Sequence, residues 1–223
     1  MKYTAVIFDM DGTIISSETV WDRTLQELLN ARSIAVTPEI KEFFNIHLHG
    51  VDMRSACSLI KDHIGLVDSV DDLVAEKIKI ANKLYPQEVA LIDGFSTFHE
   101  KLVAYNCAVG IATNANASTV KATDSRLDLI KFFGEHIYHI DHVQGIGKPN
   151  PLIFLHAAEK LGHKPEQCIV IEDSPHGIMA AKKAGMFCVA INTAKRPELL
   201  HQADMIIDHY DELDVKRLLQ ITT

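Results

Sequence analysis

Apolar residues follow two different periods along the chain, and the change between them divides it. Ala5 to Phe8 is an unbroken apolar run, which is typical of a strand buried on both faces of a parallel sheet. Between residues 16 and 91 the apolar positions recur at helical spacing, and no clear strand is predicted there. In this block we predict helices over 17–32, from Pro38 onward, and over 51–64 and 71–84.

After Asp93 and Gly94, helical and strand-like patterns alternate. Strands are predicted over 107–113, 137–140, 168–171, 187–191 and 205–207, and helices over 96–105, 118–123, 151–161, 177–184 and 211–219. This alternation implies right-handed βαβ units and a mostly parallel sheet. We therefore expect an α/β fold with a doubly wound sheet built from residues 1–15 and 92–223, and a helical domain of residues 16–91 inserted after the first strand.

Size and charge narrow the classes of partner. The 223 residues, 47% of them hydrophobic, are enough for a substantial core with a modest insert. The formal net charge of −8 argues against nucleic acid and anionic membranes as partners, but a small phosphorylated ligand could still bind in a locally positive pocket. No apolar stretch has the length of a membrane span, so no membrane association is expected.

The N-terminus and the cysteines indicate the compartment. No signal peptide is recognised, because the apolar run after Lys2 is short and leads directly into Asp9. The four cysteines lie far apart and form no Cys-x-x-Cys pair, which favours buried, reduced thiols. We therefore expect a cytoplasmic protein.

Two acidic residues stand at the end of the first predicted strand. Asp9 and Asp11 follow the apolar run and precede Gly12, at the carboxyl end of a strand, where open α/β sheets bind their ligands. Two carboxylates this close repel each other, and either a metal ion or a proton retained by one of them would remove the repulsion. A bound metal ion and a protonated carboxyl group would each suit a reaction of an anionic substrate.

Three further polar segments are expected at the same edge of the sheet. One strand ends in Thr113-Asn114, Lys148 stands just before a helix, and another strand ends in Glu172-Asp173. Each feature alone has an ordinary explanation, such as a surface lysine or acids at a helix N-terminus. Together they bring acidic, basic, hydroxyl and amide groups to one edge, which favours an active site.

These four segments, in this order and spacing, resemble the four motifs of the haloacid dehalogenase superfamily. The helical insert is similar to the cap of its β-phosphoglucomutase-like branch, and the resemblance covers essentially the whole chain. It implies a Mg²⁺-dependent phosphatase that hydrolyses a small phosphorylated metabolite, of the sugar or polyol phosphate class, through an aspartyl-phosphate. In that chemistry Asp9 is the nucleophile, and Asp11 protonates the leaving oxygen and then activates water.

The resemblance also implies roles for the other motif residues. Thr113 and Asn114 would donate hydrogen bonds to phosphoryl oxygens, and Lys148 would neutralise charge on Asp9 and on the transferring group. The expected Mg²⁺ donors are the Asp9 side chain, the Asp11 backbone carbonyl and Asp173, with Glu172 binding directly or through water.

Specificity is expected to reside in the cap. Glu18 matches an acid that the family often carries near the hinge, and Gly50 and Arg54 resemble a cap loop that faces the substrate. Arg54 would then hold a second anionic group, although a solvated arginine explains the residue equally well. Trp21 is expected to pack in the cap or hinge. Hinges are predicted near 15–16 and 91–94, and the resemblance favours a monomer because such caps close the site within one chain.

Two alternative functions stay open. A sugar-phosphate mutase of the β-phosphoglucomutase type is the nearest, but the position twelve residues after Asp9, where such mutases carry a histidine, is Trp21. A non-catalytic binding or regulatory protein is the alternative of another class, although such proteins usually lose the nucleophile or its partner. Asp11 argues against dehalogenase and phosphonate hydrolase chemistry.

Three histidines recur at every third position, and a zinc site is one interpretation of them. Their spacing fits no common zinc motif, so a surface loop is the preferred prediction. The residues are His136, His139 and His142.

Overall fold

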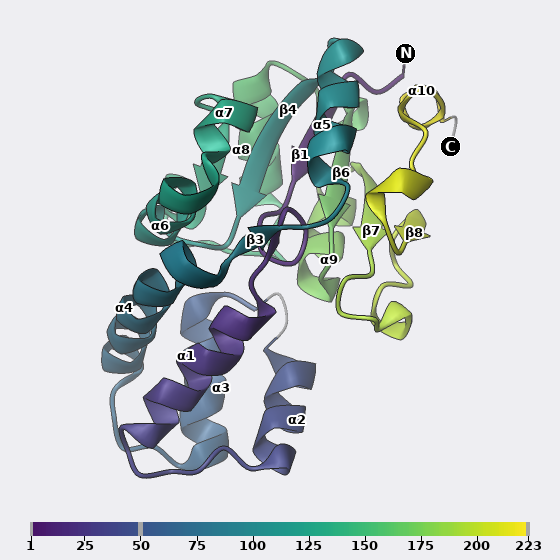
Figure 1. The fold of residues 1–223 in the computed structure, drawn as a ribbon. Helices are drawn as coiled ribbons and strands as arrows, with labels where there is room; N and C mark the ends of the chain where they lie inside the picture. The colour runs from purple at the N-terminus through teal and green to yellow at the C-terminus, as the bar shows by residue number, and fades with distance from the viewer. Residues whose placement is uncertain (1, 49–50, 222–223) are drawn as a thin grey trace.

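A six-stranded parallel sheet forms the larger lobe of the computed structural model, which describes residues 2–48 and 51–221 (Figure 1). The strand order is β5-β4-β1-β6-β7-β8, so the first strand lies in the middle of the sheet. The strands are β1 (Ala5–Phe8), β4 (Ala108–Thr113), β5 (Ile137–His139), β6 (Cys168–Glu172), β7 (Phe187–Ile191) and β8 (Met205–Ile207). The α/β, doubly wound fold predicted from the sequence is confirmed.

Helices cover both faces of this sheet. Successive residues of a strand point to opposite faces, so Val6 and Phe8 pack in one apolar cluster while Ala5 and Ile7 pack in another. The first cluster includes residues of α5 (Phe95–Ala104), α6 (Ala117–Leu127), α7 (Leu129–Phe133) and α10 (Val215–Leu218). The second includes residues of α8 (Leu152–Leu161) and α9 (Pro175–Lys183).

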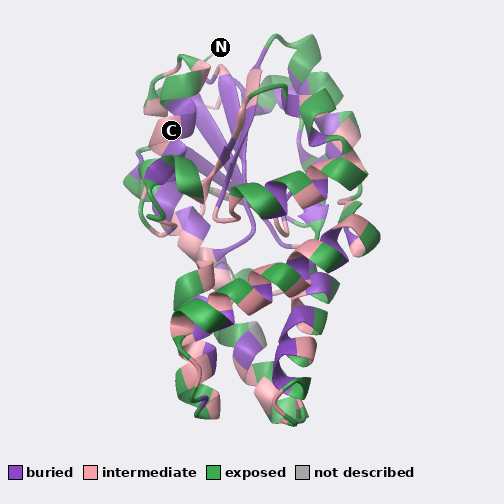
Figure 2. Cartoon of the chain, turned by 90° about the vertical axis from the view of Figure 1, so that its left-hand side faces the viewer, coloured by how far each residue is buried: buried purple, intermediate pink, exposed green. Residues whose placement is uncertain are grey.

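Four helices form the second lobe, which has an apolar core of its own (Figure 2). They are α1 (Glu18–Asn30), α2 (Pro38–His47), α3 (Met53–Ile64) and α4 (Val70–Glu88). Side chains at their N-termini accept backbone hydrogen bonds, as N-caps do: Thr37 for α2, Asp52 for α3 and Ser69 for α4. The shared core contains Leu28, Leu29, Phe44, Cys57, Ile60 and Leu73.

A short antiparallel ribbon stands where the chain enters and leaves the helical lobe. β2 (Ile15–Ser16) pairs with β3 (Ala90–Leu91), with Ile15 opposite Leu91. The prediction of no strand between residues 16 and 91 was therefore wrong at its two ends. Strands of two residues carry no periodic signal, and the pairing depends on the tertiary fold.

Helix ends also differ from the prediction. The single helix predicted over 211–219 is a 3-10 turn, Tyr210–Glu212, followed by α10, because Leu213 is extended and the Asp214 carboxylate caps a new helix start. Helix α7 was not predicted; Asp128, at φ +53°, separates it from α6. Helix α4 runs to Glu88, beyond the predicted end at residue 84.

The three histidines do not lie on a simple surface loop, so that prediction was wrong. His136 precedes β5, His139 ends it, and His142 lies in the 3-10 helix Ile140–Val143. The rings of His139 and His142 pack with centroids 3.8 Å apart, and the His139 side chain is only 16% exposed. All four cysteines are buried and free. Among the described residues, no helix is both long and apolar enough to cross a membrane.

Candidate active site

The first strand leads into a buried ion pair. Asp9 directly follows β1 and is 6% exposed, and its Oδ1 accepts a hydrogen bond from the Lys148 ammonium at 2.5 Å. The same ammonium donates to Glu172 Oε1 at 2.8 Å. Burial alone would lower the pKa of Lys148, but the charges of Asp9 and Glu172 outweigh it and hold the pKa above its ordinary value. Lys148 therefore stays charged beside Asp9.

The charge on Asp9 is not fully balanced by this pairing. Burial raises the pKa of the Asp9 carboxyl well above its ordinary value, Lys148 opposes the rise, and the charges of Glu172 and Asp173 add to it. These three carboxyl groups are all buried. A further cation or a proton at this cluster would relieve the excess of negative charge.

Glu172 is held in place by the start of α9. Its Oε2 accepts hydrogen bonds from the backbone N–H groups of Asp173 (2.9 Å) and Ser174 (2.8 Å) and from the Ser174 hydroxyl (2.9 Å). A Cβ at Gly177, in the first turn of α9, would lie 1.6 Å from Glu172 Oε1, so a glycine is needed there. Both carboxylate oxygens are engaged, and Glu172 orients Lys148.

Gly177→Ala is expected to destabilise the protein by roughly 2–4 kcal/mol, because the added methyl group must displace a hydrogen-bonded carboxylate. At an ordinary helix position the same change is stabilising by about 1 kcal/mol, so the sign of the effect is diagnostic. Urea denaturation measures the free energy of unfolding. Gly185→Ala is a comparison without the contact: nothing lies within 4 Å of an added Cβ, so only the backbone strain of φ +76°, about 1 kcal/mol, is expected. Unchanged or increased stability of Gly177→Ala would contradict the described packing.

Asp11 is connected to the helical lobe. The hydroxyl of Tyr85, near the end of α4, donates to Asp11 Oδ1, and the polar side-chain groups of Ser17 and Trp21 also act on this carboxylate. Burial raises the pKa of Asp11, and the donors of Ser17, Tyr85 and Trp21 oppose the rise. The Trp21 ring packs edge-on against Tyr85, with ring centroids 5.7 Å apart. The second acid of the first motif is therefore positioned by residues that lie outside the sheet.

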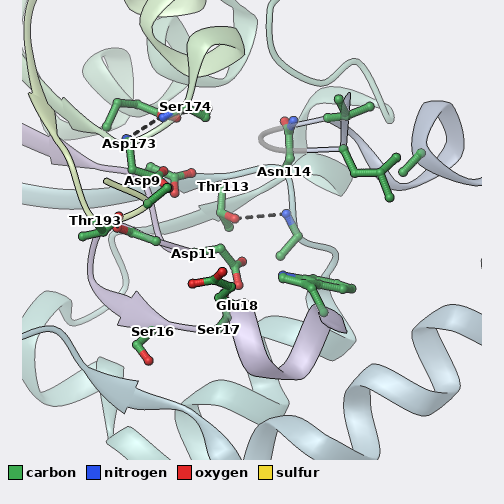
Figure 3. A pocket seen from close by; sticks show the side chains of 18 of the residues that line it. Asp9, Asp11, Ser16, Ser17, Glu18, Thr113, Asn114, Asp173, Ser174 and Thr193 are labelled. Atoms are coloured by element: carbon green, nitrogen blue, oxygen red, sulfur yellow. Dashed lines mark hydrogen bonds between the residues drawn. The ribbon is translucent and has the colours of Figure 1, made fainter. Parts of the chain in front are cut away.

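Asp173 packs against the turn that follows β1. Gly12 has φ +79°, and a Cβ there would lie 1.9 Å from Asp173 Oδ2. The Thr13 hydroxyl donates to Asp173 Oδ1 at 3.3 Å. Asp9, Asp11 and Asp173 thus gather beside the carboxyl ends of β1 and β6, together with Thr113 from β4 (Figure 3).

Two uncharged donors complete this edge. Thr113 is 1% exposed, and its oxygen accepts a hydrogen bond from the Ala115 N–H at 3.0 Å, which leaves the hydroxyl proton available. Asn114 uses its Oδ1 to accept from the Lys148 backbone N–H at 2.9 Å, whereas its buried Nδ2 has no hydrogen-bond partner within the described part of the chain. A buried amide donor without a partner is costly, and an anionic ligand would satisfy it.

A cavity of about 1120 Å³ joins this edge to the helical lobe. Asp9, Thr113 and Lys148 line it from the sheet, and Glu18 and Arg54 line it from the helices. Glu18 is exposed at the start of α1. The Arg54 side chain is 66% exposed and forms an ion pair with Asp71. Gly50, also predicted to contact substrate, lies outside the described residues.

The sequence interpretation missed two residues of the helical lobe that reach the cavity or the acids. Tyr85 contacts Asp11, and Lys77 lines the cavity although it is only 5% exposed. Both stand on α4, where an aromatic residue is usually interpreted as packing and a lysine as solvated. The sequence alone does not show whether such a residue packs, is solvated or reaches the cavity. That depends on where α1 and its Trp21 lie.

The chemistry of the donors at the sheet edge suits a hard divalent cation. No group of three or more His, Cys, Asp or Glu side chains in residues 2–48 and 51–221 is arranged as a metal site. The donors expected from the sequence are the side chains of Asp9 and Asp173 and the backbone carbonyl of Asp11, with Glu172 binding directly or through water. Carboxylate and carbonyl oxygens are the ligands that Mg²⁺ prefers, and the excess negative charge at Asp9 fits such an ion.

Residues 3–185 match the family model described as haloacid dehalogenase-like hydrolase. The chain therefore belongs to this family of hydrolases.

Individual relatives are similar along most of their length. The chain is 28% identical over 213 residues to validoxylamine A 7′-phosphate phosphatase of Streptomyces hygroscopicus subsp. limoneus, covering 95% of this chain and 96% of that one. It is 28% identical over 194 residues to fructose-1-phosphate phosphatase of Escherichia coli strain K12, with 85% and 97% covered. A crystal structure of a HAD hydrolase, family IA, variant 3, from Entamoeba histolytica superposes with a TM-score of 0.85 at 25% identity, covering 97% of each chain.

Proposed function

We propose that this protein is a Mg²⁺-dependent phosphatase that hydrolyses a small sugar or polyol phosphate through a phosphorylated aspartate. The observation that carries the proposal is the buried Asp9 carboxylate, which contacts the Lys148 ammonium and shares its edge of the sheet with further carboxylates and the unsatisfied amide of Asn114. Relatives named as phosphatases of fructose 1-phosphate and validoxylamine 7′-phosphate support the substrate class.

Asp9 is the proposed nucleophile. Its carboxylate oxygen attacks phosphorus, the bond to the leaving oxygen breaks, and the phosphoryl group is held on Asp9. Lys148, 2.5 Å from Asp9, offsets the negative charge that builds up as two anions approach. The Thr113 hydroxyl and the Asn114 amide donate hydrogen bonds to the phosphoryl oxygens.

Asp11 is the proposed general acid and base. It donates a proton to the leaving oxygen in the first step and accepts one from the attacking water in the second. Tyr85 holds its carboxylate through a hydrogen bond from the helical lobe. The proton transfers are therefore coupled to the position of that lobe.

Asp9, Asp173 and the Asp11 backbone carbonyl would hold the Mg²⁺ ion. Both oxygens of Glu172 already accept hydrogen bonds, so we propose that Glu172 acts through a water molecule and through Lys148. The bound ion supplies charge neutralisation, which lets an anionic nucleophile meet an anionic phosphate.

Residues 16–91 act in this proposal as a cap over the sheet edge. The cap moves about the paired strands β2 and β3, and Glu18 and Arg54, which line the cavity, face the leaving group. The substrate contact expected of Gly50 from the sequence stays a prediction. A lid that closes in this way excludes water during phosphoryl transfer. Each chain closes its own site, so we propose a monomer, and the free buried cysteines are compatible with a reducing, cytoplasmic compartment.

Phosphate release from a panel of sugar and polyol phosphates tests this function. Release is expected with Mg²⁺, is lost when EDTA removes the ion, and returns when excess Mg²⁺ is added. Interconversion of phosphate isomers without release would instead indicate a mutase. No reaction with any member of the panel, with or without Mg²⁺, would support a non-catalytic binding protein and contradict the proposal.

A further inference from the structure

Lys77 is a buried cation in the wall of the cavity. It lies on α4, is 5% exposed, and is one of the residues that line the cavity. Its ammonium stands 5.0 Å from the centre of the Trp21 ring, a cation–π distance. The Trp21 ring in turn packs against Tyr85, which hydrogen-bonds to Asp11. Two aromatic rings therefore connect this ammonium with the proposed general acid.

No carboxylate of the described residues neutralises Lys77, which has neither a hydrogen bond nor an ion pair among them. Burial lowers its pKa, and the Cys57 thiol is the titratable group that opposes this effect. Several acidic residues of the helical lobe pair with other cations: Asp22 with Lys41, Asp71 with Arg54, and Asp68 and Glu76 with Arg32. A buried ammonium without a counter-ion is costly, and a ligand anion would remove that cost.

We propose that Lys77 binds an anionic group, a carboxylate or a second phosphate, at the end of the substrate remote from the transferred phosphoryl group. The carbon skeleton of the substrate would then pass over Trp21 between Asp9 and Lys77. This inference rests on the proposed function, because it assigns the second end of the same cavity and names the substrate class as phosphate esters with an anionic tail.

From the sequence, Arg54 was expected to bind a second anionic group. Lys77 fits this role better. Arg54 is mostly exposed and already pairs with Asp71. Lys77 is desolvated, and no carboxylate of the described part of the lobe pairs with its side chain. Because a desolvated charge discriminates strongly between ligands with and without the opposite charge, Lys77 would act as a selectivity residue.

Binding to the Asp9→Asn variant with Mg²⁺ present tests the proposal, because it needs no turnover. Calorimetry would compare three probes with the same six-carbon chain: glucitol 6-phosphate, 6-phosphogluconate and glucitol 1,6-bisphosphate. At least one anionic-tail probe is expected to bind about tenfold or more tightly than glucitol 6-phosphate. A larger gain in affinity for 6-phosphogluconate would indicate a carboxylate site, and a larger gain for glucitol 1,6-bisphosphate would indicate a phosphate site.

Introducing Lys77→Met into the same protein is expected to abolish this preference, and Lys77→Arg to retain part of it. The matched control is Lys79→Met, which removes an equal charge from an exposed position on α4 and should leave the preference intact. Equal binding of all three probes, no binding of either anionic-tail probe, or a preference that survives Lys77→Met would overturn the proposal. A wild-type protein that shows the preference but releases no phosphate would contradict only the proposed function.

Discussion

Replacing Asp9 by asparagine is expected to reduce phosphate release by at least about a thousandfold, because the amide oxygen is a much weaker nucleophile than the carboxylate. The fold should survive, since an asparagine side chain occupies the same volume between β1 and Lys148. Steady-state phosphate release with the best substrate of the panel measures the loss, and circular dichroism checks the fold.

Asp62→Asn is the matched control for this change. Asp62 is an exposed residue of α3 that does not line the cavity, so its substitution should leave activity within about twofold of the wild type. Residual activity of Asp9→Asn close to that of the control would contradict the assignment of the nucleophile.

Replacing Lys148 by methionine is the change with the second largest expected effect, because it alters both activity and stability. The transition state loses a cation beside Asp9, which is expected to lower kcat by about a hundredfold to a thousandfold. Asp9 and Glu172 lose their shared buried partner, which is expected to destabilise the fold by roughly 3–5 kcal/mol.

The stability loss of Lys148→Met should depend on pH in metal-free buffer. Burial already raises the pKa of Asp9 in the folded protein above its ordinary 3.8, and loss of Lys148 raises it further. A group with a raised folded pKa contributes less stability as pH rises through the interval between its unfolded and folded values. The variant is therefore expected to fall further below the wild type at pH 8 than at pH 5, as measured by urea denaturation.

The control for this variant is Lys131→Met, which removes an exposed lysine of α7. Its stability and activity should match those of the wild type. If Lys148→Met lost no more stability than this control at either pH, the buried ion pair would not have the role described here.

The parallel sheet and the acids at its edge could be predicted from the sequence for a simple physical reason. A strand buried on both faces, such as Ala5 to Phe8, is an unbroken apolar run. Parallel strands end at the same edge, so Asp9, Thr113 and Asp173 were expected together, and the register of β1 with β4 and β6 brings them there. For the sheet and the acids at its edge, the local hydrophobic pattern and the parallel topology were sufficient for the prediction.

Contacts made by the helical lobe could not be predicted in the same way. Tyr85 and Lys77 occupy one face of α4, and their contacts with Asp11 and Trp21 depend on how α4 packs against α1. An amphipathic pattern shows which helix face is inward, but both packing residues and ligand-binding residues face inward. The ribbon of β2 and β3 is equally a product of tertiary pairing.

Chemical trapping of the phosphorylated aspartate tests the central claim most directly. Borohydride reduces an acyl phosphate to an alcohol, so quenching a reaction of wild-type protein, substrate and Mg²⁺ with borohydride should convert Asp9 to homoserine. Mass spectrometry of the peptide that contains β1 would locate the change. Homoserine is expected at position 9 only when substrate is present. Homoserine at Asp11 or Asp173, or unmodified peptide during active turnover, would contradict it.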